Sequence, residues 1–435
     1  MVYFLVEGLK IKMEIVIVGA GPIGCYTAQL LKKCRINSFR IIEEHDEVGR
    51  PVRCAGIVGK PVFEDSLIPL SKSSILNQIN GALFFYKGDS FKIERSGVAL
   101  VIDREKFDKE LSRGLEVEYG RRLLEIEEEG EGDAAGSGEG SRYRLKTNQG
   151  DIWADIVIGA DGPRSRVRKF IDSKGIKVKR GSSGAKKDNG NANEDSEGSE
   201  ISDSSGGETK FYKGVQYRIK LEDLKGLEDL EDGFFSRERD MTRVYMREGI
   251  PFFVWIIPEG DGVIRLGVIA ENGSRELDRV IEEEGIKGEI IERLAGIIPM
   301  GLCQSVYRKA AVVGDAARQV KPLTGGGIYY GMKAAEILVE CIQEGELAEY
   351  DKRWKSKFGK EIKFGLWARK VYERLNKNEH ELEDIFSLFK ENTEFIERAA
   401  NFENHSLVFR EAFKRPKIFV KAGKIFGRNI GKIFG

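Results

Sequence analysis

Three glycines near the N-terminus, Gly19, Gly21 and Gly24, have the spacing of a turn that binds a diphosphate. A run rich in β-branched residues ends at Val18 just before them, and a helical stretch, residues 25–33, follows. Gly19 would permit the tight turn, Gly21 would let a pyrophosphate approach the backbone, and Gly24 would let helix and strand pack closely. The N-terminus of the helix would then face the phosphates.

Glu43 supports this interpretation, because it follows a second expected strand, residues 39–42, in the same βαβ unit. A carboxylate at that position accepts hydrogen bonds from a ribose diol and disfavours a 2′-phosphate. The pattern therefore predicts FAD or NAD rather than NADP. The alternative is a glycine-rich turn without a ligand.

Two further buried runs end in acidic turns, Gly159-Ala160-Asp161-Gly162 and Gly314-Asp315-Ala316-Ala317, and residues 322–328 (PLTGGGI) then open a helix. Alone, the two aspartates would be ordinary turn and N-cap residues. Together the segments resemble the second and third fingerprints of the flavoproteins that include the aromatic hydroxylases. The resemblance implies FAD, with Asp315 at the ribityl and pyrophosphate region and the glycine turn at the flavin N1/O2 edge. It also implies that Arg104, in Ile102-Asp103-Arg104, faces the flavin-side phosphates.

The expected fold is α/β: a doubly wound, Rossmann-like FAD-binding domain of aromatic-hydroxylase type, an inserted antiparallel-sheet substrate domain and a helical C-terminal extension. Residues 181–209 are mostly Gly, Ser, Asn and acidic residues, and we predict a disordered linker there, with an acidic docking loop as the alternative. The expected domains are the FAD-binding domain at 13–62, 97–180 and 299–345, the substrate sheet at 63–96 and 210–298, and the helical region at 346–435.

Two more segments narrow the resemblance. Residues 49–56 (GRPVRCAG) resemble the Pro-x-x-Cys-x-Gly motif of the geranylgeranyl reductase family. Residues 253–258 (FVWIIP), followed by Gly267, resemble that family's Tyr-x-Trp-x-Phe-Pro…Gly-x-Gly substrate motif, with Phe253, Ile257 and Ile269 as departures. The resemblance covers about residues 13–345 without the two low-complexity insertions. Its archaeal branch reduces digeranylgeranylglycerophospholipids.

The resemblance implies an FAD-dependent enzyme that reduces C=C bonds in geranylgeranyl chains of archaeal ether lipids by hydride transfer. Cys54 would donate a proton or orient the substrate, unless it is only a packing residue. Phe253, Trp255 and Pro258 would form the lipid pocket, although core packing also explains an aromatic stripe. The FAD-binding residues would be Gly19, Gly21, Gly24, Glu43, Cys54, Ala55, Gly56, Arg104, Arg121, Asp315, Gly327 and Ile328.

Two other functions share these motifs. A flavin-dependent monooxygenase or halogenase would have the same fold and the same three FAD segments. A non-enzymatic prenyl-chain carrier would have the fold but would not need the Gly325–Gly327 turn. For a reductase, the absence of a second glycine fingerprint or a cysteine cluster predicts an external electron donor, NAD(P)H or a ferredoxin.

Composition excludes other classes. Lys+Arg and Asp+Glu both number 71, which argues against a globally basic nucleic-acid binder. Five scattered Cys and three His without metal-ligand spacing argue against a zinc or disulfide scaffold and indicate a reducing cytoplasm. No apolar run is long enough to cross a membrane. Translation from Met13 rather than Met1 is an open alternative.

The C-terminal tail, residues 412–435, carries seven Lys and Arg and no acidic residue. Apolar and basic residues recur every three to four positions, which predicts an amphipathic cationic helix from about Lys414 to Phe434. This helix would dock on the protein's own acidic body or lie in the interface of a membrane. The second alternative implies a peripheral, membrane-associated protein.

Overall fold

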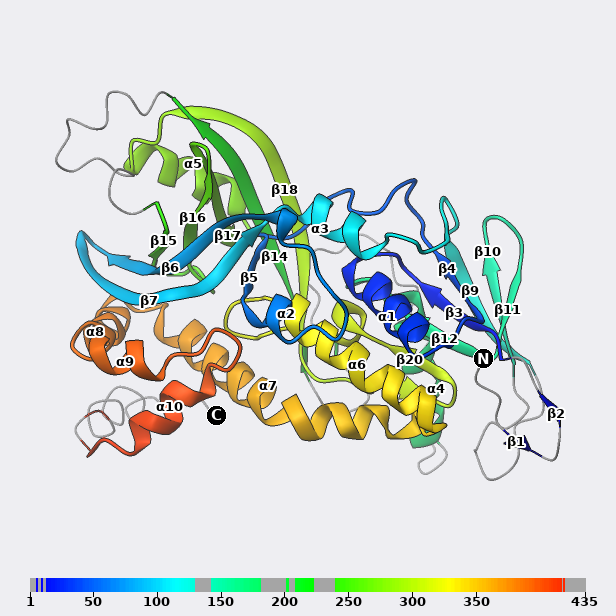
Figure 1. The fold of residues 1–435 in the computed structure, drawn as a ribbon. Coiled ribbons are helices and arrows are strands. Elements are labelled where there is room, and N and C mark those ends of the chain that lie inside the picture. The colour runs from blue at the N-terminus through cyan, green and yellow to red at the C-terminus, as the bar shows by residue number, and fades with distance from the viewer. Residues whose placement is uncertain are drawn as a thin grey trace, which may run out of the picture.

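The computed structural model describes residues 5–6, 9–10, 13–129, 142–180, 201–202, 208–222, 239–416 and 418. Most of the predicted linker 181–209 and most of the basic tail lie outside the described residues. Two sheets of different kinds dominate the described part, one at each end of the molecule in Figure 1.

The first sheet is mainly parallel and has six described strands in the order β19-β20-β12-β3-β4-β8. Both β3 and β12 are buried along their whole length, as expected for strands covered on two faces. β3 lies between β4 and β12, so the chain reverses direction across the sheet at β3. The strands are β3 (Ile15–Val18), β4 (Phe39–Ile42), β8 (Val117–Glu118), β12 (Ile156–Gly159), β19 (Val306–Tyr307) and β20 (Ala310–Val312).

Each face of this sheet is covered. On one face the core joins Ile15 and Ile17 to α1 (Pro22–Lys33) and α6 (Ile328–Glu344). On the other face Val16 and Val157 pack with an antiparallel sheet and with α4 (Arg166–Arg180). That three-stranded sheet consists of β9 (Leu123–Glu129), β10 (Arg142–Thr147) and β11 (Ile152–Ala154).

The second sheet is large and mostly antiparallel, with β15 and β6 as a parallel pair. Helix α5 (Gly273–Glu283) packs against it. This arrangement agrees with the predicted second, mostly antiparallel sheet. Its strands are β5 (Ile57–Gly59), β6 (Ile75–Tyr86), β7 (Asp89–Ile102), β13 (Ile201–Ser202), β14 (Glu208–Leu221), β15 (Met241–Tyr245), β16 (Val254–Gly260), β17 (Val263–Ile269) and β18 (Gly288–Met300).

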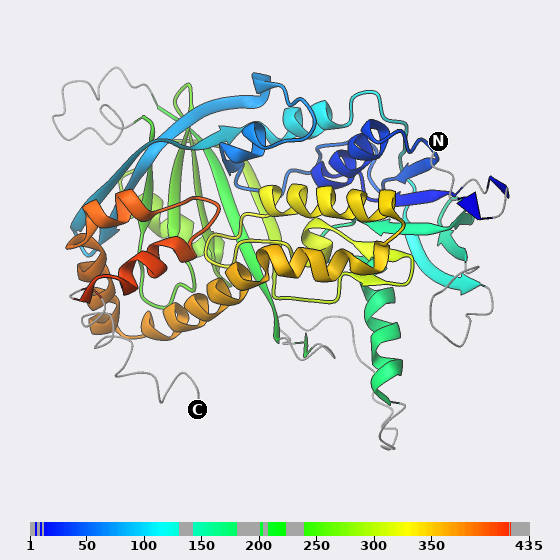
Figure 2. The same cartoon turned by 60° about the horizontal axis from the view of Figure 1, so that its bottom comes forward.

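The described C-terminal region is helical. The long helix α7 (Tyr350–Leu375) runs beside α6 and continues under the large sheet, where the last helices gather (Figures 1 and 2). None of the helices in the described ranges is long and apolar enough to cross a bilayer. The remaining described elements are β1 (Leu5–Val6), β2 (Leu9–Lys10), α2 (Pro61–Glu64), α3 (Arg104–Leu111), α8 (Glu379–Lys390), α9 (Thr393–Ala399), α10 (Ser406–Phe413) and 3₁₀ turns at Lys72–Ser74, Gly314–Ala317 and Leu347–Glu349.

Candidate active site

A cavity of about 640 Å³ lies between the two sheets, at the ends of β3, β4 and β12. Ligands of open α/β sheets bind at this carboxyl edge, where the chain direction reverses. The lining includes most of the predicted site residues: Gly19, Gly21, Glu43, Cys54, Ala55, Arg104, Arg121, Trp255, Asp315, Gly327 and Ile328. The predicted residues that do not line it are Gly24, Gly56, Phe253 and Pro258.

The first glycine turn has the shape that a diphosphate needs. A Cβ on Gly24 would lie 2.0 Å from the carbonyl oxygen of Gly19, so helix α1 can approach the turn only with glycine there. A Cβ on Gly21 would meet no atom within 4 Å, which leaves the backbone open toward the cavity. Gly21 is also the N-cap of α1, and no side chain caps the helix. The N–H groups in the first turn of α1 are therefore available to bind an anion.

Glu43 is fixed at the end of β4. Its Oε2 accepts a hydrogen bond of 2.7 Å from the N–H of Ala20, and its Oε1 accepts one of 3.0 Å from the N–H of His45. The Nδ1 atom of His45 lies 2.6 Å from the same Oε1. The carboxylate is thereby held at the wall of the cavity, as a partner for a ribose would be. Sequence reasoning missed His45.

Asp315 lies in the 3₁₀ turn Gly314–Ala317 beside the N-terminus of α6. Burial raises the pKa of Asp315 to about 6, although the charge of Arg104 lowers it. A Cβ on Gly327 would lie 2.8 Å from Oδ1 of Asp315, so only glycine lets the turn approach the carboxylate this closely. A buried carboxylate of this kind suits hydroxyl groups that donate to it, as those of a ribityl chain do.

Asp161 offers a second acceptor at the same wall of the cavity. Its Oδ2 accepts a hydrogen bond of 2.8 Å from the N–H of Arg166 and so caps α4. Its Oδ1 is buried and has no hydrogen-bond partner in the described part of the chain. Because a buried acceptor without a donor is costly, a hydroxyl-bearing ligand fits this position. The residues present therefore fit the dinucleotide that the sequence predicts.

Cys54 lines the cavity next to a buried ion pair. Arg104 donates to Asp108 from Nε at 3.1 Å and from Nη2 at 2.9 Å. Burial would lower the pKa of Arg104, but Asp108 and Cys54 raise it above its usual value. The thiol of Cys54 accepts a bond of 3.4 Å from the N–H of Gly56. Cys54 thus lies between the guanidinium of Arg104 and the turn at Gly56. Cys25, Cys303 and Cys341, in contrast, are core residues.

Arg265, which sequence reasoning missed, holds the segment that carries Cys54. Its Nη1 donates to the carbonyl of Ala55 at 2.8 Å, and its Nη2 donates to the carbonyl of Ile102 at 3.1 Å. Glu259 orients the guanidinium through an ion pair of 2.8 Å, and both residues are buried. Gly56 has φ +68°, and a Cβ there would lie 2.0 Å from Nη1. The feature of the sequence that could have revealed this role is an arginine in the otherwise apolar strand β17.

Another part of the lining is apolar and includes Trp255, Ile269 and Ile298; we call it the apolar end, and its two isoleucines lie beside Gly325. Trp255 donates from Nε1 to Gln216 at 3.1 Å. A Cβ on Gly267 would lie 2.4 Å from the indole ring, so the ring lies flat on the neighbouring strand. Phe253 packs behind it, with ring centroids 6.3 Å apart.

Pro258 lies farther along the same strand, away from the lining. Its carbonyl oxygen accepts a hydrogen bond of 3.0 Å from the side chain of Asn77 on β6. Pro258 therefore contributes to the pairing of strands in the large sheet.

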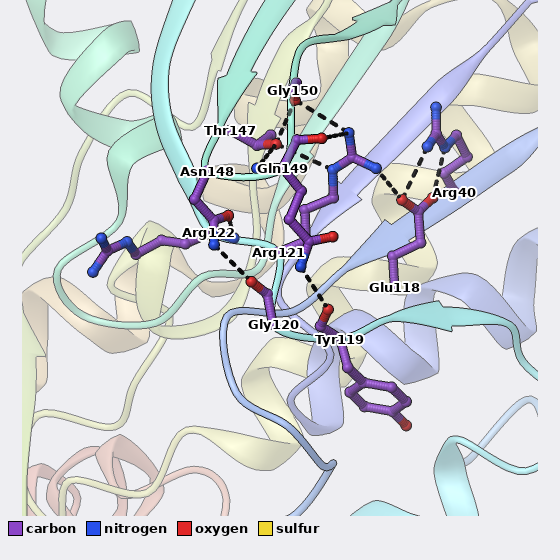
Figure 3. A network of polar contacts seen from close by, with 10 residues as sticks. All are labelled: Arg40, Glu118, Tyr119, Gly120, Arg121, Arg122, Thr147, Asn148, Gln149 and Gly150. Atoms are coloured by element: carbon purple, nitrogen blue, oxygen red, sulfur yellow. Dashed lines mark hydrogen bonds and ion pairs between the residues drawn. The ribbon is translucent and has the colours of Figure 1, made fainter.

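Arg121 belongs to a polar network that Figure 3 shows in detail. Its guanidinium donates to Glu118 at 2.5 Å, to Thr147 at 3.2 Å and to the carbonyl of Gly150 at 3.1 Å. The neighbouring Arg122 is exposed, lines the cavity and points its side chain away from this network. Of the two, Arg121 is the more firmly held by protein partners.

No protein-family model matches the chain. An uncharacterized protein of Methanocaldococcus jannaschii is 28% identical over 384 residues, which cover 83% of this chain and 84% of the relative. A digeranylgeranylglycerophospholipid reductase of Methanothrix thermoacetophila is 28% identical over 396 residues, which cover 84% of this chain and 88% of the relative. Other relatives with the same reductase name come from Thermoplasma and Methanopyrus.

Solved structures share the fold. A geranylgeranyl bacteriochlorophyll reductase-like protein of Thermoplasma acidophilum superposes with a TM-score of 0.70 at 21% identity, over 95% of this chain and 99% of that one. HpxO of Klebsiella pneumoniae, complexed with FAD, superposes with a TM-score of 0.57 at 16% identity, over 87% of this chain and 94% of that one. These comparisons confirm the predicted FAD-binding fold class, the resemblance to geranylgeranyl reductases and the prediction of an oxidoreductase.

Proposed function

We propose that this protein uses FAD to reduce C=C bonds in the geranylgeranyl chains of archaeal ether lipids. The observation that carries the proposal is a single cavity with two unlike ends. One end has the open glycine turn and the acceptors Glu43 and Asp315, and the other has the apolar residues Trp255, Ile269 and Ile298. The similarity to reductases of digeranylgeranyl lipids supports the choice of substrate.

At the nucleotide end, the chain would hold FAD through four features. The backbone at Gly21 and the N-terminus of α1 would face the diphosphate, and Glu43 would accept from a ribose. Asp315 would accept from the ribityl chain, and the turn at Gly325–Gly327 would lie at the flavin edge. When bound and reduced, FAD would supply a hydride to one carbon of the double bond.

The second carbon then needs a proton. Cys54 is the candidate donor, because it lines the cavity beside Arg104 and is anchored through Ala55 by Arg265. The alternative role of Cys54 is to orient the isoprenoid chain. At the apolar end, Trp255 and the isoleucines would exclude water and align the chain, which hydride transfer requires.

The electron donor would bind from outside, as NAD(P)H or a reduced ferredoxin. For the location we propose peripheral attachment to the cytoplasmic side of the membrane through the basic tail. The support is the sequence of residues 412–435, where seven cations alternate with Phe and Ile. A substrate that resides in a bilayer favours such an arrangement.

The test is mass spectrometry of an unsaturated archaeal ether phospholipid after anaerobic incubation with the FAD-loaded, dithionite-reduced protein. We expect products heavier by the mass of two hydrogens per reduced bond, and no such product without protein. Unchanged lipid, together with hydroxylation of an aromatic probe in a separate incubation with oxygen, would favour a monooxygenase. Unchanged lipid that co-purifies with a colourless protein would favour a prenyl-chain carrier.

A further inference from the structure

Helix α7 packs beside the apolar end of the cavity. On its inner side, Leu366 packs in the same apolar cluster as Phe253 and Trp255. A Cβ on Gly365 would lie 3.0 Å from ring atoms of Pro322, so the helix lies directly on the loop that leads to Thr324. Arg369 donates to the carbonyl of Pro322 at 3.0 Å and fixes this contact. One turn of α7 therefore packs behind residues of the proposed lipid end without lining the cavity itself.

On its outer side, α7 exposes a row of Lys360, Lys363, Trp367 and Lys370, which we call the α7 outer face. Spacings of three and four residues place these side chains on one face of the helix. Trp367 is 39% exposed, although it is a large apolar side chain. Within the described ranges, the three lysines make no side-chain hydrogen bond or ion pair. The face therefore combines free cations with an exposed aromatic ring.

A small cavity opens beside this face. It has a volume of about 330 Å³, and Ser356, Lys360 and Lys363 are among its lining residues. A hydroxyl group and ammonium groups around a hollow of this size suit a phosphate oxygen. The face thus offers both a surface for apolar contact and a place for an anionic headgroup.

The α7 outer face continues into α10 and the start of the basic tail. The ring of Phe364 lies 5.7 Å from that of Trp367 and 4.8 Å from that of Phe409 on α10. Helix α10 ends at Phe413, and Lys414 and Arg415 follow it with exposed side chains. Figure 1 shows α7 along the lower edge of the molecule with α10 beside it. Helix α10, which the basic tail follows in the sequence, therefore packs beside the α7 outer face.

We propose that the α7 outer face is the surface on which this protein lies against an anionic lipid bilayer. Lysines are attracted to anionic headgroups, and tryptophan prefers the level at which chains and headgroups meet. Leu366 and Trp367 are consecutive residues of α7, about 100° apart around its axis, so docking on Trp367 places the bilayer next to the helical turn that packs against the lipid end of the cavity. The choice of a bilayer over an acidic protein rests on the proposed function.

The first test is sedimentation of the FAD-loaded full chain with vesicles of diphytanoylphosphatidylglycerol and diphytanoylphosphatidylcholine. The variant Lys360→Glu, Lys363→Glu, Lys370→Glu is compared with the control Lys72→Glu, Lys106→Glu, Lys287→Glu, which changes three exposed lysines outside α7. At about 1 kcal/mol per basic residue, we expect binding by the α7 variant to fall about 100-fold. The control should lose much less. An equal loss in both variants would overturn the proposal.

The second test uses a matched pair of tryptophans. Trp367 is 39% exposed and Trp153, on β11, is 40% exposed. Adding the anionic vesicles should shift the fluorescence of the full chain to shorter wavelength, because a ring leaves water. The shift should persist in Trp153→Phe and disappear in Trp367→Phe. A shift that survives in Trp367→Phe, or vesicle binding by the full chain without any shift, would contradict the proposed orientation.

Neither test depends on catalysis, since the chains of these vesicle lipids are saturated. Failure of reductase activity with intact vesicle binding would overturn the proposed function and leave the docking surface in place. Reduction of detergent-dispersed lipid without vesicle binding would overturn the docking surface and leave the proposed function in place. Tight binding of an acidic protein by a chain that ignores anionic vesicles would also refute the bilayer as the partner.

Discussion

The two ends of the cavity are built in different ways. The nucleotide end depends on backbone geometry over short stretches, such as Gly19 to Gly24 and Gly325 to Gly327. The apolar end and the adjoining Cys54 segment depend on residues far apart in sequence, held by pairs such as Arg265 with Ala55, which are separated by 210 positions. Short motifs fix the first end, whereas long-range packing fixes the second. The two ends should therefore respond differently to substitution.

The largest effect should come from Arg265→Met. Losing a buried donor to the carbonyls of Ala55 and Ile102 should cost about 3–5 kcal/mol of unfolding free energy. The freed turn should also make Cys54 react faster with an alkylating reagent. Arg218→Met is the matched control, because Arg218 also pairs with Glu259, at 2.6 Å, but makes no hydrogen bond to Ala55 or Ile102. Denaturant unfolding and mass-resolved thiol labelling measure both effects. Equal effects of the two substitutions would show that the link to Ala55 is unimportant.

The next largest effect should be the difference between substitutions at Gly24 and Gly21, two glycines of the same turn. Gly24→Ala places a methyl group 2.0 Å from the oxygen of Gly19, so we expect a loss of about 1–3 kcal/mol or more in unfolding free energy. Gly21→Ala meets no protein atom within 4 Å and should leave the apoprotein stable. It should nevertheless weaken FAD binding, because the added methyl group would lie on the side of the turn where the diphosphate is expected. Thermal unfolding and FAD titration measure the two effects. If Gly21→Ala binds FAD as tightly as the unsubstituted chain, the diphosphate does not bind at this turn.

Asp315→Asn should separate binding from stability. Burial raises the pKa of Asp315 to about 6, so the folded apoprotein holds this proton more tightly than the unfolded chain. The contribution of Asp315 to stability then falls as pH rises from about 4 to about 6 and stays low above that range. Asn removes this dependence and should stabilise the apoprotein at pH 7 by up to about 3 kcal/mol. FAD binding should weaken, because the charged acceptor is lost. Apoprotein melting against pH is the measurement, and an unchanged profile would contradict the assignment.

The smallest effect should come from the linker. Replacing residues 181–209 by a short Gly/Ser segment should leave activity and melting temperature nearly unchanged, because their composition cannot form a core and, among the described residues, only the two-residue strand β13 and the first two residues of β14 lie in this segment. Turnover and thermal unfolding of the shortened chain check this prediction. A large loss of either would show that the segment contributes to the site.

Most residues that the sequence predicted for the nucleotide end line one cavity, because each feature there is local. Gly21, Glu43 and Asp315 lie at the ends of strands, and strand ends on one edge of a parallel sheet meet in space. The apolar end was predicted only in part. Trp255 lines the cavity, but Phe253 lies behind it. Periodicity does not say which of two aromatic residues faces a cavity when strands and a distant helix enclose both.

The clamp of Arg265 on Ala55 was missed for a related reason. A charged residue in an apolar strand signals a buried partner, but its identity depends on the fold of residues far away. The ion pair of Asp108 with Arg104 is easier to predict from the sequence, because Asp108 follows Arg104 by four positions on one helix.

The central claim is that one cavity places a reduced flavin against an isoprenoid chain. Anaerobic single-turnover spectroscopy tests it most directly: the FAD-loaded protein is reduced, the excess reductant is removed, and a lipid is added. We expect recovery of the oxidised flavin absorbance with a geranylgeranyl ether lipid and none with its fully saturated counterpart. Recovery that is absent with both lipids, or equal with both, would contradict the account.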